Sequence, residues 1–167
     1  MTVPVMDRAD LDTVRLQLGR PVRGGRAVVH RCGSGHPTVI ETEPRLPDGT
    51  PFPTLFYLTC PAAVAEVSTL ESQSVMRELT AELETDDDLA AAYRRAHLDY
   101  LERRERIAHV PEIEGVSAGG MPVRVKCLHV LVAHSLAVGP GVNPLGDRAL
   151  EMLAPTWTPA TCEWAPA

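Results

Sequence analysis

The side chains best suited to chemistry in this sequence are the thiols of four cysteines, Cys32, Cys60, Cys127 and Cys162. No two of them form the Cys-x-x-Cys pair that usually supplies two ligands of a structural zinc site. Scattered thiolates of this kind are compatible with an iron–sulfur cluster enclosed by the fold. We therefore predict one metal centre held by these cysteines, with an iron–sulfur cluster favoured over zinc. The alternative is four free cysteines buried as small hydrophobic residues, with no cofactor.

Three of the cysteines have sequence neighbours that favour the thiolate, the form in which cysteine binds metals. Cys60 precedes Pro61, which suits the first position of a helix and so places the thiol at a helix N-terminus. Cys127 and Cys32 each follow a basic residue. If only these three are ligands, a metal centre keeps one position open to substrate, as in catalytic sites.

An anion site is predicted beside Cys127, where Gly119 and Gly120 precede Arg124 and Lys126, the only lysine of the chain. Flexible backbone at a helix start exposes N–H groups, and the helix dipole favours an anion there. The Gly-x-x-x-x-Gly-Lys-Ser/Thr spacing of a nucleotide-binding P-loop is missing. The expected ligand is therefore an anionic small molecule.

His129 is a further candidate, although we expect it to be a hydrogen-bonding core histidine rather than a ligand. A metal-free enzyme would use Cys60 or Cys127 as nucleophile and His129 as base. The spacing of residues identifies neither a Ser/His/Asp set nor a pair of carboxylates. Whether the chain is an enzyme therefore stays open.

Length and composition predict a single domain, since 167 residues with 44% hydrophobic content can bury one core. No apolar run approaches the roughly 18 residues of a membrane span. The first eleven residues contain acids and lack the apolar stretch of a signal peptide. We expect a cytoplasmic protein with reduced thiols and no membrane contact.

Charge is distributed unevenly along the chain. The formal net charge of −6 disfavours nonspecific nucleic-acid binding. Residues 13–40 and 115–146 nevertheless contain no acid. A second hypothesis is therefore a noncatalytic binding module, in which these two stretches form a basic surface for a phosphate-rich or protein partner.

The N-terminal part should form a helix and a small sheet. Aspartates predict a capped helix over 7–18, and valine-rich runs at 26–31 and 38–43 predict a β-hairpin. Four prolines make 44–53 a turn-rich loop, after which 54–59 reads as a third strand.

Helical spacing begins at Pro61 and continues to about residue 153. A long helix should start at the acidic residues 86–88, and the most hydrophobic helix should run from about 121 to 138. Another short helix is expected over 144–153. The tail contains both tryptophans, so we expect it to be extended and to dock on the body.

These patterns predict an α+β fold in which a small antiparallel sheet of about three strands packs with five or six helices. The single domain would comprise a helix and β-hairpin region at about 7–59, a helical region at about 61–153, and a docked tail at 154–167.

Four longer strings resemble a bacterial family of uncharacterised proteins called domain of unknown function 501. They are residues 44–54 (PRLPDGTPFPT), 57–61 (YLTCP), 117–129 (SAGGMPVRVKCLH) and 141–147 (GVNPLGD). The likeness extends from about residue 11 to 147 and implies no reaction. It includes Cys32, Cys60 and Cys127 but not Cys162, and it adds Arg45 and Asp48 as candidate site residues.

Overall fold

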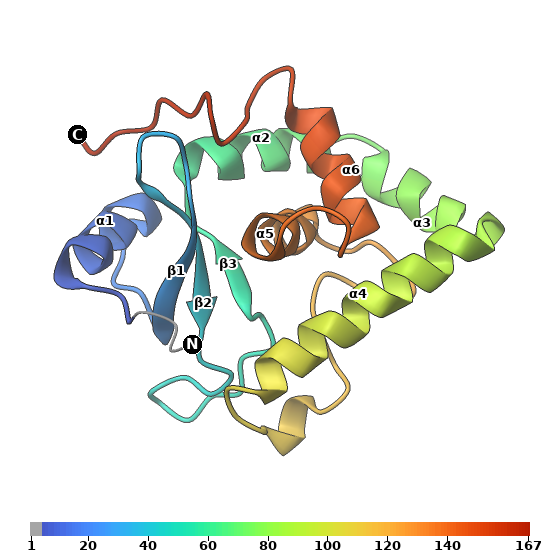
Figure 1. The fold of residues 1–167 in the computed structure, drawn as a ribbon, viewed down its shortest axis with the longest axis horizontal. Coiled ribbons are helices and arrows are strands. Elements are labelled where there is room, and N and C mark those ends of the chain that lie inside the picture. The colour runs from blue at the N-terminus through green and yellow to red at the C-terminus, as the bar shows by residue number, and fades with distance from the viewer. Residues whose placement is uncertain (1–4) are drawn as a thin grey trace.

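A three-stranded antiparallel sheet has helices on both faces in the computed structural model, which describes residues 5–167 (Figure 1). The strands, in the spatial order β1-β2-β3, are β1 (Gly25–Arg31), β2 (Pro37–Thr42) and β3 (Phe56–Leu58). The α-helices are α1 (Arg8–Leu18), α2 (Pro61–Glu71), α3 (Val75–Thr85), α4 (Asp87–Glu105), α5 (Leu128–Val138) and α6 (Pro144–Leu153). A 3₁₀ turn, η1, covers Pro111–Ile113. The predicted α+β class is confirmed.

Both faces of strand β2 are buried. Its successive side chains point to opposite faces of the sheet, so each face contributes to a different core. Val39 belongs to the main core, whereas Ile40 belongs to a smaller core beneath α1. Their partners on β3, Leu58 and Tyr57, follow the same alternation. Helix α1 therefore covers one face of the sheet, and the remaining helices cover the other.

Helix caps predicted from sequence are present at three helix starts. The carboxylate of Asp7 accepts a hydrogen bond from the backbone N–H of Asp10 at 2.8 Å. Asp86 caps α4 in the same way, and Asn143 caps α6. Each cap satisfies a backbone donor that a helix start leaves unpaired, so these elements begin where local chemistry predicts.

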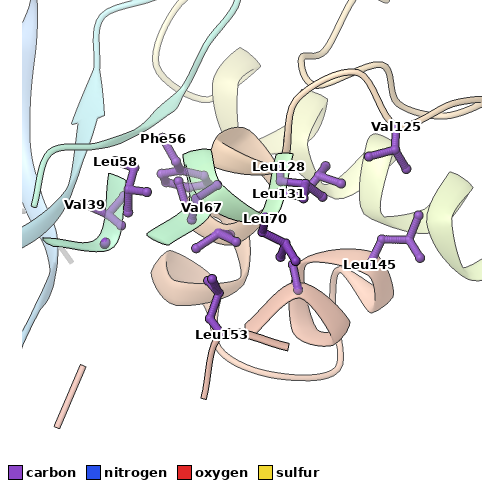
Figure 2. Packing of buried hydrophobic residues seen from close by; sticks show 14 of the residues in the cluster. Val39, Phe56, Leu58, Val67, Leu70, Val125, Leu128, Leu131, Leu145 and Leu153 are labelled. Atoms are coloured by element: carbon purple, nitrogen blue, oxygen red, sulfur yellow. The ribbon is translucent and has the colours of Figure 1, made fainter. Parts of the chain in front are cut away.

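Helix α5 lies at the centre of the fold, between the sheet and α4 (Figure 1). Leu128 and Leu131 are fully buried against residues of α2, α6 and β3, as Figure 2 shows. Gly146 lets α6 approach α5 closely, since a Cβ there would overlap the carbonyl oxygen of Leu131 and the hydroxyl of Ser135. Contacts with α2, α6 and β3 thus fix the position of α5.

The helix predicted over 121–138 begins later than expected, at Leu128. Gly119 and Gly120 have left-handed φ angles of 70° and 92°, and the Gly119 carbonyl accepts a hydrogen bond of 2.8 Å from the Lys126 N–H. These contacts fold residues 121–127 into a compact turn. Cys127 is therefore the N-cap of α5 and not a residue within the helix.

The C-terminal tail packs against the β1–β2 turn and the main core. Trp157 and Cys162 are buried, and the Gly33 N–H donates a 2.8 Å hydrogen bond to the Pro159 carbonyl. The tail runs back past α2 toward the β1–β2 turn (Figure 1). Across residues 5–167, no helix combines the length and the apolarity that a bilayer crossing requires.

Candidate metal centre

Glu71, Cys127 and His129 form a cluster of one oxygen, one sulfur and one nitrogen ligand. The three candidate ligand atoms lie within 4.8 Å of one another, and all three residues are half-buried. Within residues 5–167, this is the one group of three or more histidine, cysteine or acidic side chains close enough to hold a metal ion. The cluster joins the end of α2 to the start of α5.

The turn at 119–127 positions Cys127. The Tyr93 hydroxyl donates to the Arg124 carbonyl at 3.0 Å, and the Val125 N–H donates to the Thr80 hydroxyl at 3.0 Å. Hydrogen bonds with α3 and α4 thus anchor the turn. Its anchored backbone fixes Cys127 at the N-cap of α5.

Glu71 is held by the first turn of α5. Its Oε1 accepts a 2.6 Å hydrogen bond from the Leu128 N–H and lies 3.1 Å from His129 Nδ1. This hydrogen bond at the start of α5 fixes the orientation of the carboxylate. His129 Nε2 lies 3.3 Å from the hydroxyl of Ser68, one turn before Glu71 on α2.

The cluster favours the protonated, positively charged form of His129. A hydrogen bond to Cys127 and the charge of Glu71 together outweigh burial and raise the pKa of His129 to about 9. The imidazole is therefore protonated at neutral pH. Its charge offsets that of the Glu71 carboxylate beside it.

A cleft of about 640 Å³ opens beside the cluster. Its lining residues come from α1, β3, α2 and α5, and they are Gln17, Leu18, Thr54, Phe56, Tyr57, Leu58, Thr59, Pro61, Val64, Ala65, Cys127, His129 and Val130. Most are apolar, a composition typical of small-molecule sites. The buried Thr59 Oγ1 and Gln17 Oε1 have no hydrogen-bond partner among residues 5–167.

The core histidine is His134 and not His129, contrary to expectation. His134 is fully buried, with Nε2 2.9 Å from Asp99 Oδ2 and Nδ1 3.2 Å from Asn143 Nδ2. Its ring stacks on Phe56. His129, with 25% of its side chain exposed, lines the cleft instead.

The other three cysteines gather at the opposite end of α2. Cys60 is the N-cap of α2, and its sulfur lies 3.5 Å from the sulfur of Cys162. Cys32 is close enough to Cys162 to affect its ionisation. Eleven helical residues span about 16 Å, so α2 separates this group from Glu71 and its partners. Ligation of one metal centre by all four cysteines stays a prediction.

The four residues predicted to bind an anion lie in the turn that positions Cys127. The Arg124 N–H donates to the Gly120 carbonyl at 3.1 Å, and the Lys126 N–H to Gly119. These groups are therefore bonded within the turn and are not presented at a helix start. Anion binding, which would now depend on the exposed side chains of Arg124 and Lys126, stays a prediction.

Arg45 and Asp48 stabilise the loop before β3. Arg45 pairs with Glu112 at 2.7 Å, and Asp48 pairs with Arg23. The backbone N–H of Thr50 lowers the pKa of Asp48 by donating to its carboxylate. Neither Arg45 nor Asp48 lines the cleft.

Glu71 is the site residue that sequence reasoning missed. It lies on another helix, far from Cys127 in the chain, and no local motif marks it. The Cys127-x-His129 spacing was the available signal, because the two side chains can meet where an extended residue enters a helix.

Comparison with protein families shows which family the chain belongs to. The family model described as "Protein of unknown function (DUF501)" matches residues 28–151, which is well over half of the sequence. The chain belongs to the DUF501 family. This match confirms the resemblance seen in the sequence and covers Glu71, Cys127 and His129, while Cys162 lies beyond it. No curated protein and no solved structure matches this DUF501 chain.

Proposed function

We propose that this DUF501 protein binds one divalent metal ion, zinc being the best match, through Glu71, Cys127 and His129. The metal would present an open coordination position to the adjacent cleft. The observation that carries the proposal is the mutual spacing of the three ligand atoms, within 4.8 Å, at the wall of that cleft.

The donor set fits zinc. Zinc accepts thiolate, imidazole and carboxylate at about 2.0–2.3 Å, so ligand atoms around a tetrahedral ion are roughly 3.3–3.8 Å apart. The ligand atoms need to approach one another by about 1.5 Å at most to reach this spacing. An iron–sulfur cluster is less well supported, because such clusters usually draw four cysteines and this group has one.

The charges also support a cation. In the metal-free protein, the proton on His129 offsets the charge of the Glu71 carboxylate. A metal ion would take over that role and displace the proton. The metal ion would therefore replace the proton as the positive charge beside Glu71, and the neighbouring residues would not need to rearrange.

The fourth position gives the site its chemistry. Zinc with three protein ligands and one exchangeable position is typical of catalytic centres, where it supplies activated water and polarises a carbonyl oxygen. The cleft would hold the apolar body of a ligand against the largely apolar residues that line it. The reaction class we infer is metal-assisted hydrolysis of a largely apolar carbonyl compound.

Zinc titration against a competing chromophoric chelator tests this proposal. The expected result is one zinc per chain in the wild type and binding at least about 100-fold weaker in Cys127→Ser and in His129→Gln. Cys60→Ser is the matched cysteine control and should bind as the wild type does. Equal loss in Cys60→Ser and Cys127→Ser, or no binding in the wild type, would contradict the proposal.

A second candidate is a metal-free cysteine enzyme, which the same contacts favour. A thiol hydrogen-bonded to an imidazole, itself oriented by a carboxylate, is the arrangement that activates a cysteine nucleophile. Cys127, His129 and Glu71 contain these three groups in that order.

Thiol labelling distinguishes the two candidates. In the metal proposal, stoichiometric zinc protects Cys127 from iodoacetamide, and a chelator restores labelling. In the cysteine-enzyme candidate, labelling of Cys127 is fast whether zinc is added or not, and His129→Gln slows it. The tryptic peptide 127–148 reports Cys127 alone.

A further inference from the structure

A second thiol centre lies where the C-terminal tail crosses the start of α2. The sulfurs of Cys60 and Cys162 are 3.5 Å apart, although 102 positions separate the two residues in the chain. Cys32, at the end of the β1 strand, is buried beside them. All three side chains are at most 6% exposed.

The surroundings of Cys162 stabilise a thiolate. Although burial opposes ionisation, its pKa is lowered by the backbone N–H of Trp164 and by the neighbouring thiols. The buried indole nitrogen of Trp157 has no hydrogen-bond partner among residues 5–167. Burial raises the pKa of Cys60, so Cys60 remains the thiol of the pair.

This geometry suits a disulfide better than a metal ion. Three thiolates around one ion need sulfurs about 3.8 Å apart, but Cys32, Cys60 and Cys162 do not form a group within 4.8 Å. A disulfide needs only two sulfurs, about 2.05 Å apart, so Cys60 and Cys162 must approach by about 1.5 Å. The tail at 154–167 has no helix or strand over the thiols that would resist this movement.

We propose that Cys60 and Cys162 are a redox-active dithiol that a hydroperoxide oxidises to a disulfide, which fixes the tail to the start of α2. The tail is also held by the packing of Trp157, by the 2.8 Å hydrogen bond from the Gly33 N–H to the Pro159 carbonyl, and by a 3.3 Å hydrogen bond from the Ser34 hydroxyl to the Cys162 carbonyl. Local release of these contacts admits the oxidant.

The reaction with hydrogen peroxide proceeds in two steps. The Cys162 thiolate attacks one peroxide oxygen, the O–O bond breaks, and the departing hydroxide takes a proton to become water. The Cys60 sulfur then attacks the sulfenic acid of Cys162, and the hydroxyl leaves with the Cys60 proton as a second water. Two thiols lose two electrons, and one peroxide gains them.

Peptide mapping tests the proposal because trypsin places each cysteine on its own peptide. These peptides are residues 32–45, 46–77, 127–148 and 149–167. Reduced protein is treated with a few equivalents of hydrogen peroxide, alkylated, and digested without reductant. The expected product joins 46–77 to 149–167, and its mass is about 2 Da below that of the two free peptides.

Two further measurements separate this link from adventitious oxidation. Cys127→Ser and Cys32→Ser should each retain the link, while the melting temperature of the wild type should rise by about 5 °C or more on oxidation and fall again with dithiothreitol. The proposal is overturned if both peptides are recovered alkylated, if 32–45 carries the link, or if Cys162→Ser abolishes a metal bound by the wild type.

Discussion

The Glu71 carboxylate accepts a 2.6 Å hydrogen bond from the backbone N–H of Leu128, and this contact ties the last residue of α2 to the first of α5. The same oxygen lies 3.1 Å from His129 Nδ1. One side chain therefore acts as a helix cap and as a proposed metal ligand. The two roles can be separated by substitution.

Replacing Glu71 with glutamine should keep the cap and weaken the metal site. The amide oxygen of Glu71→Gln still accepts from Leu128, so unfolding free energy should change by less than about 0.5 kcal/mol, whereas Glu71→Ala should lose about 1 kcal/mol. Both should bind zinc at least about tenfold more weakly. Urea unfolding and zinc titration measure the two effects.

Glu66→Gln, on the same helix, is the matched control and should change neither quantity. Equal zinc affinity in Glu71→Gln and wild type would show that Glu71 caps α5 without binding the metal.

Zinc binding should release the proton of His129. Because the pKa of His129 is about 9, the metal must displace that proton at lower pH. Apparent affinity should therefore rise with pH by about tenfold per unit for this proton until pH 9. Calorimetry at pH 7 in buffers of different ionisation enthalpy counts the protons released, and zero protons would contradict the assignment.

Stability of the metal-free protein should fall as the pH rises from about 6.5 to 9. The folded-state pKa of His129 lies above its unfolded value, so its contribution is complete below about 6.5 and is lost through 9. His129→Gln should flatten this part of the profile. Thermal melts with a chelator present measure it, and an unchanged slope in the variant would argue against the charged cluster.

Acid should destabilise the core through His134. Burial lowers the pKa of His134 despite its hydrogen bond to Asp99, so the folded protein disfavours the charged ring. Unfolded chains bind that proton more readily, and stability should fall as the pH drops below about 6.5. His134→Gln should reduce the fall, which urea unfolding at pH 5 and 7 would detect.

Close packing of α6 on α5 predicts a severe effect of Gly146→Ala. The added methyl group would overlap the Leu131 carbonyl oxygen and the Ser135 hydroxyl, so the two helices must separate. The expected loss is about 3 kcal/mol or more of unfolding free energy. Glu151→Ala, on the exposed face of α6, is the control and should change it by less than about 0.5 kcal/mol.

Local chemistry in the sequence predicted most of the fold. Asp7, Asp86 and Asn143 start their helices as expected, and Cys60 lies at the start of α2 because Pro61 suits the first helical position. The runs of the hairpin that are rich in valine and isoleucine likewise form strands of the observed sheet. Each of these features depends on residues within a few positions.

The candidate site could not be predicted in the same way, because tertiary contacts build it. The turn before α5 depends on Thr80 and Tyr93, which the helical pattern of 121–138 does not reveal. Glu71 reaches Leu128 and His129 only through the packing of α2 on α5. The same packing separates Cys127 from Cys60, which sequence reasoning had placed in one centre.

Zinc K-edge X-ray absorption of the zinc-loaded protein tests the central proposal most directly, because it counts sulfur neighbours around the ion. We predict one sulfur at about 2.3 Å from Cys127 and two or three nitrogen or oxygen atoms at about 2.0–2.1 Å. The sulfur shell should disappear in Cys127→Ser and persist in Cys60→Ser. A shell of three or four sulfurs would contradict the Glu71, Cys127 and His129 site. It would support ligation of the metal by the four cysteines instead.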